Sequence, residues 1–202
     1  MQGQYNIENA KGVFLRHGGM LRTHEIIDAG VHPRTFYAMR DSGVVERLGR
    51  GLYRLAEMPP LDNPDLIAVA LKVPHGVICL ISALAYHEIT TQIPHEVYLA
   101  LKRGTEPPRL DYPPIHAFWF TGKAFTEGIE THMVDNVPVR IYSPEKTLAD
   151  CFKYRNKIGL DTAIEALKLY KERRKVNRDD LLRFAGICRM EKVMRPYLEA
   201  LL

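Results

Sequence analysis

The chain has 202 residues, of which 46% are hydrophobic and 26% are charged. These values are typical of a folded globular protein and exclude a wholly disordered chain, and the length suits one large or two small domains. The longest apolar stretch, residues 77–86, is too short to span a membrane, and the N-terminal residues lack the pattern of a secretion signal. We therefore expect a cytoplasmic protein without membrane segments.

The net charge of +4 is distributed unevenly along the chain. Residues 1–56 carry eight Lys and Arg against five acids, residues 57–145 carry six against eleven, and residues 146–202 carry fourteen against eight. A basic segment before an acidic middle fits a small nucleic-acid-binding domain on a larger body, although uneven charge is also common on ordinary solvated surfaces. The three cysteines are widely spaced, so we expect them to be reduced.

Residues 1–56 predict three helices. Apolar spacing predicts a helix over residues 7–17 and a short second helix over residues 24–29, for which Thr23 can supply the N-terminal cap. Pro33 suits the first position of a third helix that ends near Ser42.

Two short strands are expected after these helices, at residues 44–48 and 52–55. The glycines on either side of Arg50 permit the positive φ angles of a tight hairpin. This order of three helices and a hairpin is that of a winged helix-turn-helix, whose third helix enters the major groove of DNA.

The third helix divides into an inward and an outward side. Phe36 and Met39 share one side and are expected to be buried. Arg34 can bond a guanine edge, and the hairpin tip can reach phosphates or the minor groove. The predicted DNA-binding residues are Arg34, Thr35, Tyr37, Ala38, Arg40 and Arg50. Such residues are also common on ordinary solvated surfaces, and some winged helices bind proteins instead of DNA.

A proline-rich stretch at residues 57–64 predicts a linker between two domains. Beyond it, residues 65–202 predict an α+β domain that ends in a run of helices. Periodicity cannot decide between strand and helix for residues 77–87. Helices are expected at 65–73, from Ser143 to about 155, at 160–173, from Asn177, and at 192–201, and strands at 96–101, 115–120, 129–134 and 137–142.

No pattern in the second domain predicts catalysis. His87-Glu88 and His95-Glu96 lack the second histidine that a zinc-protease helix requires, and neither paired metal-binding cysteines nor a phosphate-binding glycine loop is present. A nuclease using Glu96, Lys102 or Asp150 would fit no recognised spacing. We therefore expect a protein that is not an enzyme and holds no metal or cofactor.

Three sequence segments carry a family resemblance: residues 30–37 with 49–55, residues 141–150, and residues 153–159. Together they include Gly49-Arg50-Gly51-Leu52-Tyr53 and Ser143-Pro144-Glu145-Lys146-Thr147-Leu148-Ala149-Asp150. Across residues 10–173 the chain resembles the AbiE-type antitoxins, which are bacterial transcriptional regulators of type IV toxin-antitoxin systems. His32 departs from the small hydroxyl residue expected before the third helix.

The resemblance implies an N-terminal winged helix that represses its own operon and a larger mixed α/β domain that counters a nucleotidyltransferase-like toxin. The expected partners are the toxin and double-stranded DNA at the protein's own promoter. That DNA is expected to contain inverted repeats, on which a dimer can bind. The alternatives are a protein-interaction module and a stand-alone transcriptional regulator without a toxin.

Overall fold

The computed structural model describes residues 2–201, with side chains from Asn6 onward. The chain forms two compact units. Unit 1 comprises residues 1–64 and 134–137, and unit 2 comprises residues 65–133 and 138–202. Within the described residues, no helix is both long and apolar enough to cross a membrane.

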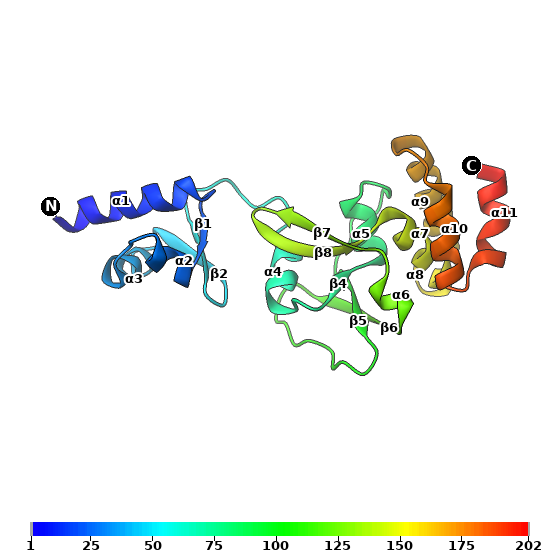
Figure 1. Ribbon diagram of the computed structural model, residues 1–202, viewed down its shortest axis with the longest axis horizontal. Coiled ribbons are helices and arrows are strands. Elements are labelled where there is room, and N and C mark those ends of the chain that lie inside the picture. Colours follow the sequence, from blue (N-terminus) through cyan, green and yellow to red (C-terminus); the bar gives the residue numbers. More distant parts are fainter. Residues whose placement is uncertain (1, 202) are drawn as a thin grey trace. The chain divides into compact units, whose positions relative to one another are not determined.

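Unit 1 is a winged helix-turn-helix, as predicted. Its elements are α1 (Gln2–Arg16), β1 (Met20–Arg22), α2 (Thr23–Asp28), α3 (Pro33–Asp41), β2 (Val45–Gly49) and β3 (Leu52–Leu55) (Figure 1). The three strands form an antiparallel sheet in the order β1-β3-β2. Strand β1 was not predicted, because three residues are too few to show alternation.

The core of unit 1 joins all three helices to the sheet. Phe14 of α1, Ile26 of α2 and Phe36 of α3 are buried with Leu55 of β3. The ring of Phe36 meets that of Tyr53 edge to face, with centroids 4.7 Å apart, which is a favourable aromatic geometry. The sheet and α3 are therefore packed as one body.

The cap predicted for α2 is wrong. Thr23 is the first residue of the helix, and its hydroxyl donates to the carbonyl of Gly51 at 3.3 Å. The residue before it, Arg22, donates its backbone N–H to the Glu25 carboxylate at 2.6 Å. Thr23 is thus used to join α2 to the hairpin turn, a long-range contact that a local capping rule cannot reveal.

Unit 2 is built on a mixed five-stranded sheet in the order β6-β5-β4-β8-β7. Strand β4 pairs antiparallel with β5 and parallel with β8, and β5 pairs parallel with β6. Its elements are α4 (Pro64–Lys72), β4 (Val77–Ile78), α5 (Leu80–Tyr86), β5 (Val97–Lys102), β6 (Ile115–Phe120), α6 (Lys123–Thr126), β7 (Ile129–Val134), β8 (Val137–Tyr142), α7 (Pro144–Lys153), α8 (Arg155–Ile158), α9 (Leu160–Arg173), α10 (Arg178–Ile187) and α11 (Glu191–Leu201).

The undecided run at residues 77–87 contains both a strand and a helix. Strand β4 ends at Ile78 and α5 begins at Leu80, which has a φ of 45° although it is not glycine. The side chain of Leu80 is fully buried in the core of unit 2. The change of structure therefore takes place inside a continuous apolar segment.

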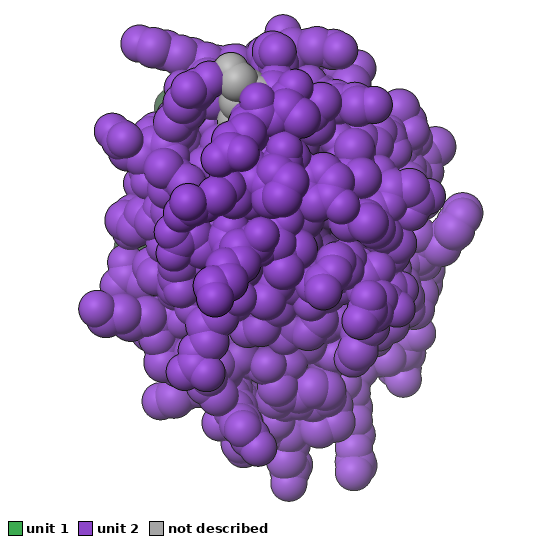
Figure 2. Space-filling view, turned by 90° about the vertical axis from the view of Figure 1, so that its right-hand side faces the viewer, with its two compact units in different colours: residues 1–64, 134–137 green, residues 65–133, 138–202 purple. Residues whose placement is uncertain are grey.

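One face of the sheet of unit 2 is covered by helices. Val77, Ala100, Phe118 and Tyr142 are buried in one cluster with side chains of α5, α7, α9, α10 and α11. Figure 2 views unit 2 from the side on which Figure 1 places α9, α10 and α11, so that these three helices are nearest to the viewer. Most of the apolar burial in this unit is thus between the sheet and its C-terminal helices.

Two of the predicted helix starts in unit 2, at Ser143 and Asn177, are confirmed by their caps. The Ser143 hydroxyl accepts from the Lys146 N–H at 3.3 Å at the start of α7, with Pro144 at the first position. The Asn177 side chain accepts from the Asp180 N–H at 3.1 Å at the start of α10. Each cap satisfies a backbone donor that the helix leaves free.

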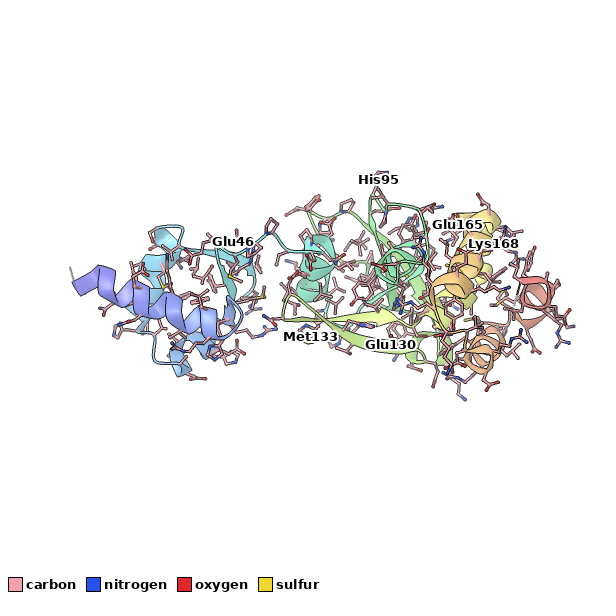
Figure 3. The ribbon with its side chains drawn as sticks, turned by 90° about the horizontal axis from the view of Figure 1, so that it is seen from above. Glu46, His95, Glu130, Met133, Glu165 and Lys168 are labelled. Carbon is pink, nitrogen blue, oxygen red and sulfur yellow. The ribbon has the colours of Figure 1, made fainter. Side chains whose placement is uncertain are left out.

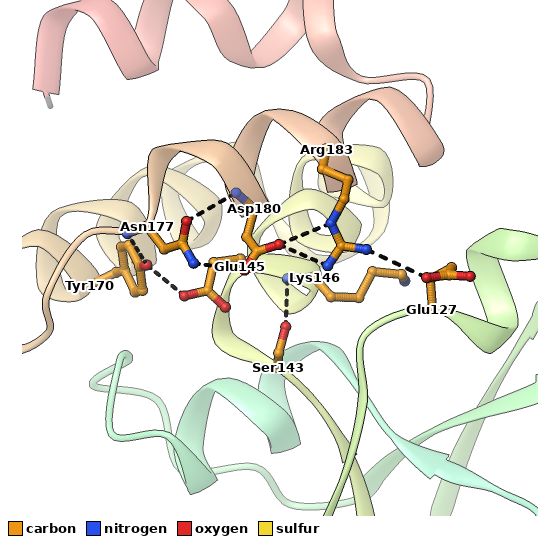
Figure 4. A network of polar contacts seen from close by, with 8 residues as sticks. All are labelled: Glu127, Ser143, Glu145, Lys146, Tyr170, Asn177, Asp180 and Arg183. Carbon is orange, nitrogen blue, oxygen red and sulfur yellow. Dashed lines mark hydrogen bonds and ion pairs between the residues drawn. The ribbon is translucent and has the colours of Figure 1, made fainter.

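A polar network fastens α7, α9 and α10 to one another (Figure 4). The Tyr170 hydroxyl donates to Glu145 at 2.6 Å and accepts from the Asn177 N–H at 2.9 Å. Asp180 pairs with Arg183, which also reaches Glu127 at 3.4 Å. The basic C-terminal helices therefore use part of their charge within the unit.

Candidate nucleic-acid interface

Helix α3 is amphipathic in the predicted sense. Phe36 and Met39 are buried, with exposed fractions of 1% and 0%. On the other side of the helix Arg34, Ala38 and Arg40 are exposed, Tyr37 is 47% exposed, and Thr35 is half-buried. The core contacts thus fix one side of α3 and leave the other free for a partner.

The start of α3 is capped by an imidazole. His32 lies before Pro33, and its Nδ1 accepts the backbone N–H of Arg34 at 3.2 Å. The ring nitrogen thus accepts a free backbone N–H of the first turn, a role that a hydroxyl or carboxylate oxygen has in most capped helices. The departure from the expected small hydroxyl residue therefore leaves α3 with a defined start at Pro33.

Arg40 and Tyr37 are brought together, and Arg40 is already paired. Its guanidinium carbon lies 5.0 Å from the centroid of the Tyr37 ring, and it forms an ion pair with Asp41 at 2.7 Å. The hydrogen bond that Arg40 donates to the Asp41 carboxylate raises the pKa of Arg40. Within the described residues Arg34 and Arg50 form no ion pair, unlike Arg40 and Arg54, and Arg16, Arg22 and Arg47 of this unit form none either.

Arg50 lies in the turn between β2 and β3, apart from the α3 residues in the chain. Gly49 pairs with Leu52, so that Arg50 and Gly51 form the turn, and Gly51 has a φ of 69° that favours glycine. Arg50 is exposed, as a wing residue must be to reach a nucleic acid.

Arg47 is an exposed cation that the sequence reasoning missed. It lies on β2, and its Nε donates to the Gly49 carbonyl at 3.0 Å. The strand has a register shift between Arg47 and Gly49, which interrupts simple alternation. A search for basic residues just before Gly49, as well as between Gly49 and Gly51, would have found Arg47.

Arg54 has a structural role instead. It is buried, pairs with Glu46 of β2 at 2.9 Å, and donates to the carbonyl of Pro59. Figure 3 labels Glu46 on this sheet. The wing sheet therefore holds the first residues of the proline-rich stretch, and Arg54 is not available to a ligand.

The acids and lysine of the nuclease alternative do not form a catalytic group. Asp150 is fully buried and bonded to Lys146 and Cys188, while Glu96 lies just before β5 and bonds His116. Lys102 is exposed at the end of β5. Among the residues that the structure describes, no group of three or more His, Cys, Asp or Glu side chains could hold a metal ion.

Comparison with known proteins identifies the N-terminal domain. Residues 13–56 match the family model described as "Transcriptional regulator, AbiEi antitoxin". For this segment the match confirms the resemblance to AbiE-type antitoxins. No curated protein sequence matches the chain.

The fold also has a counterpart among solved structures. The chain is similar to the crystal structure of the RV2827C protein from Mycobacterium tuberculosis, with 13% sequence identity and a TM-score of 0.55. The similarity covers 88% of this chain and 69% of that chain. At this identity the comparison shows a shared fold alone.

Proposed function

Proceeding from the AbiEi-type winged helix at residues 13–56, we propose that the chain is a DNA-binding transcriptional repressor and the antitoxin of a type IV toxin-antitoxin system. It represses its own operon and counters a nucleotidyltransferase-like toxin without being an enzyme. The observation that carries the proposal is the exposed side of α3, where Arg34 and Tyr37 lie opposite the buried Phe36 and Met39.

In the proposed complex α3 enters the major groove. Arg34 bonds a guanine edge. The hydroxyl of Thr35 forms a hydrogen bond with a base or a phosphate, and that of Tyr37 donates one to a phosphate. Ala38 leaves room for close approach, and Arg40 contacts a phosphate after releasing Asp41. Arg50 reaches a phosphate or the minor groove from the wing.

The test is binding of the full chain to the region upstream of its own gene, measured by fluorescence anisotropy at several salt concentrations. We expect Arg34→Ala and Arg50→Ala to weaken binding, and each lost phosphate contact to lower the salt slope by about 0.9. Arg16→Ala is the control, because Arg16 is also exposed in unit 1 but lies at the end of α1.

Unchanged affinity and salt slope in both test variants would overturn the proposed surface and favour the winged helix as a protein-interaction module.

A two-fold operator requires two copies of the domain, since half-sites mirror protein symmetry, and we propose a dimer on inverted repeats.

We propose a division of labour between residues 1–56 as the DNA-binding domain, 57–64 as the linker, and 65–202 as the antitoxin domain. Removing the residues after about 60 should abolish neutralisation of the co-expressed toxin while some DNA binding remains. Rescue of growth by the N-terminal part alone would contradict this division, and normal repression without any toxin partner would favour a stand-alone regulator.

A further inference from the structure

A series of aromatic rings runs along the β5–β6 edge of unit 2, outside the proposed DNA-binding surface. We call it the ring ladder, and its members are Tyr98, His116, Phe118, Phe120 and Tyr154. The rings of Tyr98, His116 and Phe118 are nearly parallel to one another, with interplanar angles of 19–21° and centroids 4.7–5.8 Å apart. Strand pairing produces this arrangement, since Tyr98 lies beside His116 in the parallel register.

The ring ladder runs from the core to the surface. Phe118 and Phe120 are buried in the core of unit 2, whereas Tyr98 and Tyr154 are half-buried and the His116 side chain is 44% exposed. The Nδ1 of His116 bonds the Glu96 carboxylate at 2.7 Å, which holds the imidazole in place. Strand β6 is at the edge of the sheet, so no further strand of unit 2 covers this end of the ring ladder.

Two lysines lie against the same rings. The Nζ of Lys157 is 5.4 Å from the centroid of Phe118 and 6.0 Å from that of Tyr154. The Nζ of Lys153 is 5.6 Å from Phe120 and 5.7 Å from Tyr154. Neither lysine forms an ion pair within the part of the chain that the structure describes.

The segment that carries the two lysines is also one-sided in charge, although the Glu96 carboxylate bonded to His116 places one acidic group beside the rings. Residues 151–160 contain Lys153, Arg155 and Lys157 and no acidic residue. Arg155 donates to the carbonyl of Phe152 and to the sulfur of Met190, so no carboxylate neutralises it there. Flat rings beside uncompensated cations match the two parts of a nucleotide, a base that stacks and a phosphate that is negatively charged.

We propose that the ring ladder binds a single-stranded nucleic acid. Bases stack on His116 and Tyr98, and the phosphates lie near Lys157 and Lys153. A neutral or apolar protein segment would use the rings but would leave both ammonium groups without a partner. This binding is separate from the reading of duplex DNA by α3 and the wing.

The test uses the full chain carrying Arg34→Ala and Arg50→Ala, so that the N-terminal domain contributes little. Fluorescein-labelled 12-residue oligo(dT) and oligo(U) are titrated at low salt. We expect His116→Ala to weaken binding about five-fold to 150-fold, which is the range for loss of one stacked base. Lys157→Ala should also lower the salt slope by about 0.7.

Two matched variants distinguish loss of the aromatic ring, and of the charge beside it, from the nonspecific effect of a substitution. His116→Phe keeps a flat ring and should retain most of the affinity. Lys168→Ala removes an exposed cation of α9, labelled in Figure 3, that is outside the ring ladder, and should have a much smaller effect than Lys157→Ala. Circular dichroism of each variant verifies that unit 2 is folded.

Photocrosslinking gives the position directly. Oligonucleotides containing 5-iodouracil should crosslink to Tyr98, His116 or Tyr154, as mapped by mass spectrometry. Absence of binding, equal affinity of His116→Ala and the parent, or crosslinks confined to unit 1 would overturn the proposal. The proposal would also be overturned if His116→Ala changed the oligomeric state measured by sedimentation but not the affinity for the oligonucleotide. That result would show that the β6 edge pairs with a second copy of the chain.

Discussion

Separating the two members of the buried Lys146 and Asp150 pair should strongly destabilise unit 2. Both side chains are fully buried on α7, with the Lys146 Nζ 2.5 Å from the Asp150 carboxylate. The other oxygen of Asp150 accepts from the Cys188 thiol at 3.2 Å, and the Lys146 Nζ lies 4.0 Å from the centroid of the Tyr142 ring. Burial raises the pKa of Asp150, while Lys146 and Cys188 act in the opposite direction.

The expected magnitude follows from the burial of both charges. Asp150→Asn leaves an ammonium group without its counter-ion in the core, and Lys146→Met leaves a carboxylate without its own. Loss of one partner of a fully buried pair typically costs about 3–5 kcal/mol, because a charge remains that neither water nor a counter-ion stabilises. Replacing both by apolar residues of similar volume removes that penalty and is often nearly neutral.

Urea unfolding followed by tryptophan fluorescence measures this cost. Trp119 is the single tryptophan of the chain and lies on β6, 43% exposed, so its signal reports on unit 2. We expect each single variant to lose about 3–5 kcal/mol and Lys146→Met/Asp150→Leu to lose far less than their sum. A loss below about 1 kcal/mol in Asp150→Asn, or simple addition in the double variant, would refute the reasoning.

Three further predictions use other buried groups. Burial lowers the pKa of His87, whose Nε2 lies 2.7 Å from the Tyr142 carbonyl, so the unfolded chain binds the proton more readily. The free energy of unfolding should therefore fall as the pH drops below the ordinary pKa of histidine. In urea unfolding between pH 7 and 5, it should fall less steeply for His87→Gln than for the parent. Equal slopes would exclude His87 as the cause. Arg54→Ala should cost about 1–3 kcal/mol and accelerate proteolysis at residues 57–64, because Glu46 and the Pro59 carbonyl lose their donor; cleavage at the parent rate would contradict this. Burial raises the pKa of the Cys188 thiol to about 12 and those of the other two cysteines well above their ordinary value, so a thiol reagent at pH 8 should react only after unfolding; one fast equivalent in the native protein would show an accessible thiol.

The sequence predicted the elements whose signals are local. The helix expected at residues 160–173 has those bounds as α9, and Ser143 with Pro144 begins α7 as its capping pattern predicts. The two residues left between the strands expected at 129–134 and 137–142 form a turn, in which Asp135 and Asn136 both adopt the positive φ that such a hairpin needs. These features depend on neighbouring residues alone.

Features that depend on distant contacts were missed. Strand β1 exists because it pairs with β3, and Thr23 bonds Gly51 instead of capping α2. The Lys146 and Asp150 spacing of four residues is ordinary on an exposed helix, and the packing of α5, α9 and α10 around α7 is what buries the pair. For the candidate interface, periodicity predicted which side of α3 is exposed but not the pairing of Arg40 with Asp41.

Leu80 shows that a sharp change of secondary structure need not be marked by glycine. A left-handed backbone costs a bulky residue roughly 1–3 kcal/mol, and complete burial of a leucine side chain returns about 1.5–3 kcal/mol. Glycine would relax the main chain but leave a cavity in the core, and loss of a buried leucine side chain typically costs about 2–5 kcal/mol, so burial outweighs the strain at Leu80. No glycine or proline marks a boundary of this kind in the sequence, because the residue at which the chain bends is also a residue of the core.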